Sequence, residues 1–369
     1  MKILVTGAKG FVGKNLIVTL ERLEDMEIYQ FDIDTDPALL DTYTKDCEFV
    51  FHLAGVNRPQ NVEEFMEGNF GFTSELLNSL KNNHNTCPIL ITSSIQAALD
   101  NPYGQSKKAG EDLLFSYGQE TGAKVLVYRL PNVFGKWCRP NYNSAVATFC
   151  HNIAHDLPIK VNDPNVVMNL VYIDDVVEEL IRALNGNETR EGDFCIVPIV
   201  HTIKLGEIVE LICSFKNSRS ELSIPNMADA FTKKLYATYL SYLPEDQFSY
   251  PLKMNVDNRG SFTEMIRTPE RGQVSVNISQ PGITKGNHWH HTKNEKFLVV
   301  SGRGVIRFRK VGSDEVIEYH VSGEKLEVVD IPTGYTHNIE NLGDSDMVTI
   351  MWANECFDPE KPDTYFLEV

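Results

Sequence analysis

The sequence predicts two domains of different class, an α/β domain with a parallel sheet followed by an all-β domain. At 369 residues the chain is longer than a single hydrophobic core usually supports. Up to about residue 240, short apolar runs alternate with stretches of helical periodicity, which is typical of βαβ units. After about residue 250, short β-rich runs are separated by Gly, Pro, Asn and Ser, which indicates a β-sandwich or jelly roll. We expect domains 1–243 and 251–369, with a boundary near Pro244–Pro251.

The elements of the first domain follow from the period of the apolar residues. The predicted strands are Lys2–Thr6, Glu27–Phe31, Phe49–Leu53, Ile89–Thr92 and Lys124–Arg129. The predicted helices are Phe11–Leu23, Asn69–Leu80 and Lys107–Tyr117. In the second domain the predicted strands are Val274–Ile278, Glu295–Val300, Gly304–Lys310, Glu315–Val321, Lys325–Ile331 and Met347–Trp352.

Composition narrows the classes of partner. A net charge of -17 argues against nucleic acid or an anionic membrane as the main partner, because both demand a positive surface. The seven cysteines form no Cys-x-x-Cys pair, which fits reduced thiols better than a disulfide framework. No apolar run approaches the ~20 residues of a membrane span. We therefore expect a cytoplasmic protein.

A glycine-rich motif, G-x-x-G-x-x-G, lies between the first predicted strand and the first predicted helix. Glycines there permit a tight turn and let the backbone approach a pyrophosphate, whose charge the helix N-terminus favours. Because the motif opens a βαβ unit, we interpret it as a dinucleotide site; a merely flexible turn is the alternative. Its residues are Gly7, Ala8, Lys9, Gly10, Phe11, Val12 and Gly13.

Asp32 ends the second predicted strand, where a carboxylate can accept hydrogen bonds from the adenosine ribose. That position favours NAD over NADP, because the carboxylate repels a 2′-phosphate. Lys9 in the glycine loop can offset this repulsion. A turn residue in an acidic stretch is the alternative interpretation of Asp32.

A Y-x-x-x-K motif places Tyr103 and Lys107 on one face of a helix. A cation beside the phenol lowers its pKa and favours proton donation to a carbonyl. Ser93 or Ser94, at the end of a strand, can orient the same carbonyl. Y-x-x-x-K is common by chance, but the glycine loop and the strand-end serines make it a more specific indication of a proton donor to a carbonyl.

Three histidines and one glutamate form a predicted metal site in the second domain. His288 and His290 alternate along a strand, so they point to one face, with Glu295 and His337 arriving from other strands. Three imidazoles and a carboxylate suit a divalent cation. The alternative is a metal-free site whose histidines do acid/base work. His291 should face the opposite side and is not an expected ligand.

These motifs give residues 1 to about 240 a resemblance to the extended short-chain dehydrogenase/reductases, with a Rossmann-type fold. The stretches His52–Gly55, Asn69–Thr73, Arg129–Gly135 and Tyr172–Val176 support the resemblance. It implies that the glycine loop, Asp32, Leu53, Ala54 and Gly55 hold the dinucleotide. It also implies Tyr103 as acid/base, Lys107 on the nicotinamide ribose, and Ser94 at the serine/threonine position. The candidate substrate contacts are Arg58, Asn132, Lys136 and Arg139.

The second domain resembles the cupins, in G-x5-H-x-H-x4-E-x6-G from Gly282 to Gly302 and P-x-G-x2-H-x3-N from Pro332 to Asn341. Residues 257–264 and 277–288 are also similar to the nucleotide-sugar 3,5-epimerases. That similarity implies Arg259 and Lys285 as contacts near a diphosphate. It places the family's catalytic base at His288, which is also a metal-ligand position, so the base stays unassigned.

Together the two halves resemble the CapF-type bifunctional enzymes of capsular polysaccharide synthesis, in the UDP-L-FucNAc route. The resemblance implies a UDP-linked 4-keto-6-deoxy amino sugar as substrate, UDP-2-acetamido-2,6-dideoxy-L-hexos-4-ulose. The cupin would epimerise carbon 3, and the reductase would reduce the carbon 4 ketone to UDP-2-acetamido-2,6-dideoxy-L-talose. It implies NADPH and Zn²⁺, with NAD, Mn or Fe also compatible with the residues, and a homodimer.

Three alternatives remain at this point. The cupin can be a non-catalytic module for dimerisation or substrate binding. The whole chain can be a UDP-sugar 4-epimerase or dehydratase that retains NAD without net consumption. A non-catalytic NADPH sensor is the third, and it would tolerate loss of the Tyr103 hydroxyl.

Overall fold

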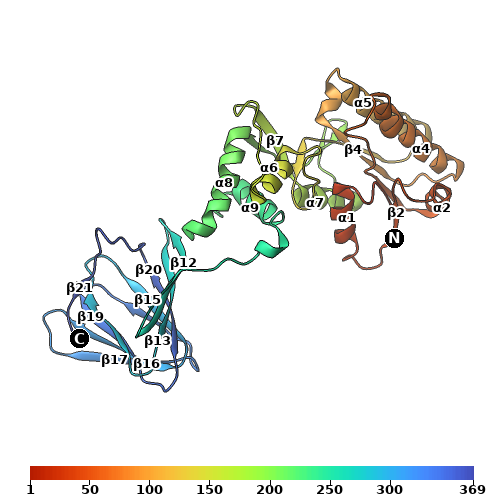
Figure 1. Ribbon diagram of the computed structural model, residues 1–369. Helices are drawn as coiled ribbons and strands as arrows, with labels where there is room; N and C mark the ends of the chain where they lie inside the picture. Colours follow the sequence, from red (N-terminus) through yellow and green to blue (C-terminus); the bar gives the residue numbers. More distant parts are fainter. The chain divides into compact units, whose positions relative to one another are not determined.

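The computed structural model describes residues 1–369 (Figure 1). The chain divides into two compact units. The first comprises Met1–Cys213 and Ala228–Pro244, and the second comprises Ser214–Met227 and Glu245–Val369.

A seven-stranded sheet forms the centre of the first unit, in the order β2-β1-β3-β4-β5-β9-β8. All neighbouring pairs are parallel except β8 with β9. Its strands are β1 (Lys2–Thr6), β2 (Glu27–Phe31), β3 (Phe49–His52), β4 (Ile89–Ser94), β5 (Val125–Leu130), β8 (Arg190–Glu191) and β9 (Phe194–Cys195). This order places the carboxyl ends of β1, β3 and β4 side by side, which is where ligands bind in such sheets.

Helices cover both faces of that sheet, because its strands carry apolar residues on both sides. On one face Leu16 and Leu180 pack with Val5 and Phe51, and on the other Leu76 and Leu114 belong to a second core. The first face is covered by α1 (Phe11–Leu20) and α7 (Ile173–Leu184), the second by α2 (Ala38–Asp46), α4 (Phe72–Asn82) and α5 (Pro102–Thr121). The predicted Rossmann-type α/β architecture is confirmed.

The predicted helix Asn69–Leu80 differs from the structure at its start. α4 begins at Phe72, and α3 (Glu63–Met66) leads into a wider π-helical turn, η1 (Glu67–Gly71). At Gly68 this turn runs against Val56, since a Cβ added to the glycine would lie 2.2 Å from Cγ2 of Val56. Asn69, the next residue, is hydrogen-bonded to the N–H and the carbonyl of Val56 in the loop after β3.

The remaining elements of this part of the chain are short strands and helices. A three-stranded sheet has the order β10-β7-β6, with β6 (Asn132–Phe134), β7 (Val167–Tyr172) and β10 (His201–Lys204). The other helices are η2 (Ile95–Ala98), α6 (Ala145–Ala154), α8 (Leu205–Glu221), α9 (Ala230–Leu240) and η3 (Glu245–Gln247). Of these, η3 and the end of α8 from Ser214 belong to the second unit. No helix has both the length and the apolar character needed to cross a bilayer.

The second unit contains two antiparallel sheets with a hydrophobic core that includes Phe297, Ile306, Ile339 and Met347. One has the order β11-β12-β13-β20-β15-β18 and the other β17-β16-β19-β14-β21. The first set is β11 (Met254–Asp257), β12 (Gly260–Thr268), β13 (Gly272–Ser279), β15 (Glu295–Ser301), β18 (Val328–Ile331) and β20 (Met347–Ala353). The second set is β14 (Thr284–Trp289), β16 (Arg303–Lys310), β17 (Val316–Ser322), β19 (Tyr335–Asn341) and β21 (Tyr365–Phe366). This all-antiparallel arrangement confirms the predicted β class and is consistent with a cupin.

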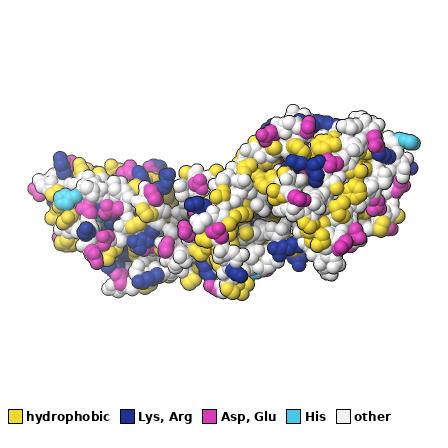
Figure 2. Space-filling view, turned by 90° about the horizontal axis from the view of Figure 1, so that it is seen from above, with side chains coloured by type: hydrophobic (Ala, Val, Ile, Leu, Met, Phe, Trp, Pro, Cys, Tyr) yellow, Lys and Arg dark blue, Asp and Glu magenta, His cyan; other side chains and the backbone are white.

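Charged side chains of both signs are interspersed over the face of the molecule drawn in Figure 2. Although the net charge is -17, this face is therefore not uniformly acidic.

Candidate active site and metal centre

The glycine loop lies tightly against the loop after β3. Gly7 has a φ of +67°, and a Cβ there would lie 2.7 Å from the backbone nitrogen of Ala54. A Cβ on Gly13 would lie 2.2 Å from the carbonyl oxygen of Gly7, so the first turn of α1 also needs a glycine. The N-cap of α1, Gly10, has no side chain that caps the helix. The free N–H groups at this end suit a phosphate.

One cavity of about 1390 Å³ adjoins this loop. That volume exceeds the ~300–1,000 Å³ of an ordinary small-ligand pocket, and it leaves room for a dinucleotide with a second ligand. Every predicted cofactor residue lines it: Gly7, Lys9, Gly10, Phe11, Val12, Gly13, Asp32, Leu53, Ala54, Gly55 and Lys107. Tyr103, Ser94 and Asn132 line the same cavity.

Asp32 lies at the end of β2 beside the glycine loop. Its carboxylate accepts hydrogen bonds from the backbone N–H of Lys9 at 2.7 Å and of Ile33 at 2.8 Å. The ammonium of Lys9 forms an ion pair with Asp34. Lys9 and Asp32 are therefore adjacent, as the expected offset of the Asp32 charge by Lys9 requires. The ammonium of Lys9, however, contacts Asp34 and not Asp32.

Tyr103 and Lys107 lie in the first turns of α5 and face the cavity. The helix begins there because the side chain of Asn101 accepts the Gly104 N–H at 2.8 Å and Pro102 follows that cap. The Lys107 nitrogen lies 5.9 Å from the centroid of the Tyr103 ring and donates to the Thr92 carbonyl at 3.4 Å. The Tyr103 hydroxyl donates to Oδ1 of Asn57 at 2.9 Å.

Burial controls the protonation of this pair. It lowers the pKa of Lys107 to about 8, against a raising effect of the Glu111 carboxylate. It raises the pKa of Tyr103, and a hydrogen bond with Ser94 acts in the opposite direction. Desolvation of the phenolate is the largest influence on this pKa, and it acts against the lowering expected from a neighbouring cation. A protonated Tyr103 is the form that can donate a proton.

The two strand-end serines have different surroundings. The hydroxyl of Ser93 donates to Glu111 at 2.6 Å, and Arg129 holds the same carboxylate through two hydrogen bonds of 2.9 and 2.6 Å. Ser94 is the residue in contact with Tyr103, and its oxygen accepts the Gln96 N–H at 3.2 Å. Of the two, Ser94 has the better place to orient a carbonyl.

The candidate substrate contacts of the first unit separate into two groups. Asn132 and Arg139 line the cavity. Arg58 is exposed and is not among the lining residues, and Lys136 forms an ion pair with Asp174 instead.

Asn57 and Asn69 are polar residues of this site whose contacts the motifs do not specify. The amide of Asn69 bonds the Val56 N–H at 2.9 Å, the Val56 carbonyl at 3.0 Å and the Ser106 hydroxyl at 3.0 Å. It thereby holds the loop that carries Asn57 beside α5. Asn69 is the first residue of Asn69–Thr73, one of the stretches that support the reductase resemblance. No motif in the sequence marks Asn57 as a site residue.

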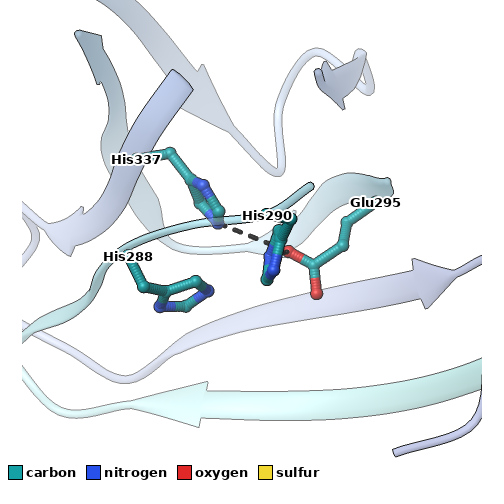
Figure 3. A group of neighbouring side chains, drawn as sticks. All are labelled: His288, His290, Glu295 and His337. Atoms are coloured by element: carbon teal, nitrogen blue, oxygen red, sulfur yellow. Dashed lines mark ion pairs between the residues drawn. The ribbon is translucent and has the colours of Figure 1, made fainter. Parts of the chain in front are cut away.

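In the second unit His288, His290, Glu295 and His337 converge (Figure 3). They come from β14, the residue after β14, the start of β15, and β19. One ligand atom from each lies within 4.8 Å of the others. The Glu295 oxygen Oε2 is 3.4 Å from Nε2 of His290 and 3.3 Å from Nε2 of His337.

The donor atoms of this cluster fit a cation. Oε2 of Glu295 and Nε2 of both His290 and His337 are buried without a hydrogen-bond partner, a costly arrangement that a shared metal ion would satisfy. Burial lowers the pKa of His288 to about 4, with a smaller contribution from His337, so its imidazole is neutral at neutral pH. Burial raises the pKa of Glu295, but the histidine contacts outweigh it and hold that pKa below its ordinary value. Neutral imidazoles with an ionised carboxylate are the ligand forms that a metal requires.

Three further residues of the second unit were considered in the sequence, namely His291, Lys285 and Arg259. His291 packs against Trp289, with ring centroids 4.5 Å apart, and is not in the cluster. Lys285 on β14 donates to Oδ1 of Asn277 and to the Ile278 carbonyl, both at 2.8 Å. Arg259 is exposed and paired with Asp257 at 2.6 Å.

Comparison with known proteins identifies both halves. Residues 3–196 match the NAD dependent epimerase/dehydratase family, and residues 255–365 match the polysaccharide biosynthesis C-terminal domain. The crystal structure of the capsular polysaccharide assembling protein CapF from Staphylococcus aureus is 60% identical over 100% of both chains, with a TM-score of 0.96. A UDP-2-acetamido-2,6-beta-L-arabino-hexul-4-ose reductase from Pseudomonas aeruginosa is 46% identical over 100% of this chain and 99% of that protein. RMD from Pseudomonas aeruginosa, solved with NADPH, is 22% identical over 66% of this chain and 99% of that chain, with a TM-score of 0.53, which shows a shared fold.

The fold, the dinucleotide cavity and these similarities define an NAD(P)-dependent reductase joined to a β domain with a candidate metal site. The chain belongs to the NAD dependent epimerase/dehydratase family, as a CapF-type member with a polysaccharide biosynthesis C-terminal domain.

Proposed function

We propose that this protein makes a precursor of a surface polysaccharide in two steps on one UDP-linked sugar. The substrate is UDP-2-acetamido-2,6-dideoxy-L-hexos-4-ulose. The second unit epimerises carbon 3, and the first unit then reduces the carbon 4 ketone with NADPH to UDP-2-acetamido-2,6-dideoxy-L-talose. The relatives named above support the substrate class. The observation that carries the proposal is the Tyr103–Lys107 pair in the cavity that the glycine loop adjoins.

The reduction needs one hydride and one proton. NADPH, when bound, supplies the hydride to carbon 4. The Tyr103 hydroxyl supplies the proton to the ketone oxygen, and Ser94 orients that oxygen by a hydrogen bond. Lys107 holds the nicotinamide ribose and keeps positive charge near the phenolate that remains. Asn57, which accepts the Tyr103 hydrogen bond, gives way to the ketone oxygen.

Epimerisation exploits the same ketone. The proton on carbon 3 is acidic because the neighbouring carbonyl delocalises the charge left on its removal. A divalent cation held by His288, His290, Glu295 and His337 would supply positive charge that stabilises the developing anion. Zn²⁺ suits the three imidazoles and one carboxylate, and Mn or Fe suits them as well. Lys285 and Arg259 are the candidate diphosphate contacts of this unit.

The cofactor and assembly proposals follow from the family resemblance. NADPH is the proposed dinucleotide, and NAD is the alternative because Asp32 is the residue expected at the ribose; its carboxylate accepts the Lys9 N–H. The expected assembly is a homodimer, which light scattering would test.

The deciding experiment incubates the full chain with the 4-keto sugar and NADPH in heavy water. We expect oxidation of one NADPH per product and deuterium at carbon 3. Tyr103→Phe should lower the reduction rate about 10²–10⁴-fold and spare exchange at carbon 3, because only the proton donor is lost. Tyr117→Phe, also on α5, removes a hydroxyl bonded to the Asn85 carbonyl and should leave both activities intact.

Two results would contradict the proposal. Loss of carbon 3 exchange in Tyr103→Phe would refute separate sites. Absence of exchange in the wild-type chain would leave the second unit as a non-catalytic module.

A further inference from the structure

The C-terminal residues lie against β14, the strand that carries His288 and ends one residue before His290. β21 pairs with β14 in antiparallel register, so that Phe366 lies opposite His288 and Tyr365 opposite Trp289. The Leu367 N–H donates to the Asn287 carbonyl at 3.0 Å. The end of the chain therefore extends the sheet at its metal-bearing strand.

The carboxylate of Asp363 anchors this tail to the loop between β14 and β15. It accepts hydrogen bonds from three consecutive backbone N–H groups, those of His291 at 3.0 Å, Thr292 at 2.7 Å and Lys293 at 2.8 Å. It also accepts from the Thr292 hydroxyl at 3.1 Å. Consecutive N–H groups that converge in this way form a concave anion site, and here the tail supplies the anion.

The backbone carbonyl of the same residue contacts a candidate metal ligand. The Asp363 carbonyl oxygen is hydrogen-bonded to Nδ1 of His290. A carbonyl oxygen can only accept, so Nδ1 carries the hydrogen and Nε2 presents its lone pair. Nε2 is the atom that lies 3.4 Å from Glu295 and has no hydrogen-bond partner.

We propose that Asp363 is a positioning residue for the metal centre. Its carboxylate fixes the tail on the β14–β15 loop, and its carbonyl fixes the tautomer and ring direction of His290. Because the loop and the ligand are held by one residue, metal binding and docking of the tail stabilise each other. The inference rests on the proposed metal site and goes beyond it by assigning a role to the end of the chain.

Other contacts of the tail allow the side chain to be tested without removing the tail. The Tyr365 and Trp289 rings have centroids 5.1 Å apart, and the β14–β21 pairing uses backbone atoms alone. These contacts remain in Asp363→Ala and Asp363→Asn, so both variants retain part of the docking while losing the anchor.

The first experiment measures the Zn²⁺ affinity of the full chain by competition with a chromogenic chelator. Asp363→Ala should weaken the affinity about 10–100-fold, because a residue that orients a metal ligand typically contributes that much. Asp363→Asn should weaken it too, since an amide nitrogen would face N–H donors. The matched control is Asp358→Ala, since that tail carboxylate accepts only the Glu360 N–H, at 2.9 Å. Unchanged affinity in Asp363→Ala would overturn the proposal.

A second measurement uses the wild-type chain and does not depend on the folding of any variant. Amide hydrogen exchange is followed in the Zn²⁺-loaded protein and after removal of Zn²⁺ by a chelator. We expect faster exchange without Zn²⁺ at His291, Thr292, Lys293 and Leu367, whose amides hold the tail. Equal exchange in the two states would contradict the coupling. A wild-type chain that binds no Zn²⁺ would overturn both the metal site and this inference, whereas Zn²⁺ binding without coupling overturns this inference alone.

Discussion

Glu111 is a fully buried carboxylate that lies one helical turn after Lys107 on α5. Its oxygens bind the hydroxyl of Ser93 and the guanidinium of Arg129, which lie on β4 and β5. The ring of Phe194 stacks on Arg129, with 3.8 Å between the guanidinium carbon and the ring centroid. The Glu111 side chain therefore connects the helix that carries Tyr103 to the two strands that end at the cavity.

We expect Glu111→Gln to move the alkaline limb of the reduction rate to lower pH. Burial lowers the pKa of Lys107 to about 8 and the Glu111 charge opposes that effect, so loss of the charge lowers the pKa further. Wild-type activity should thus fall as pH rises through about 8, where the ammonium loses its proton, and the variant should fall earlier. The pH profile of kcat/KM for the ketone measures this shift.

The control for Glu111→Gln is Glu120→Gln, on the same helix but ion-paired with Lys81 at the surface. Its profile should match the wild type. An unshifted limb in Glu111→Gln would show that the carboxylate does not act on Lys107.

Residues differ in how far the sequence can predict their roles. The convergence of the four candidate metal ligands was predictable, because strand alternation and fixed spacing place these residues together. Asn57 contacts Tyr103, Glu111 acts on Lys107, and Asp363 contacts His290, each from a position whose proximity depends on the complete fold. No local spacing marks them, since a lone Asn, Glu or Asp is ordinary in any surface segment.

At the scale of elements, the π-helical turn η1 holds the loop after β3 through Asn69. We expect Asn69→Ala to lower the free energy of unfolding by about 1–3 kcal/mol, because the N–H and carbonyl of Val56 lose their partner. It should also lower the reduction rate, since the loop that carries Asn57 is released. Urea unfolding measures the first effect and NADPH oxidation the second.

Asn187→Ala removes an exposed asparagine beyond α7 and serves as the control, with both quantities unchanged. If Asn69→Ala had the wild-type free energy of unfolding and the wild-type reduction rate, the proposed role of η1 in holding the loop after β3 would be refuted.

Strands were easier to predict than helix ends in this chain. β1 and β2 have the predicted bounds. In β1 a buried apolar run, Ile3–Val5, ends at the glycine loop, so its limits are clear from the sequence. The helix that contains Tyr103 begins at Pro102, well before the predicted Lys107, since its start depends on the cap from Asn101. The π turn was not predictable from periodicity, which carries no signal for the close approach of Gly68 to Val56.

At the scale of the whole molecule, the candidate dinucleotide cavity and the candidate metal cluster belong to different compact units. A ligand that binds only the folded form of a unit stabilises that unit by mass action. We therefore expect scanning calorimetry of the full chain to resolve two unfolding transitions, one raised by NADPH and the other by Zn²⁺. At a free ligand concentration of about one hundred times Kd, the added free energy is about 2.7 kcal/mol, enough for a rise of several degrees in Tm.

Variants of each site assign the two transitions. His290→Ala removes a candidate ligand from the cluster, so its calorimetric trace should lose the response to Zn²⁺ and keep the response to NADPH. Gly55→Ala should lose the response to NADPH and keep the response to Zn²⁺. Its Cβ would lie 2.8 Å from the Lys107 nitrogen and 2.9 Å from Oδ1 of Asn69, beside the candidate dinucleotide cavity. A single transition that shifts with either ligand would mean that the units unfold together, and the assignment of separate stabilities to the two chemistries would then be wrong.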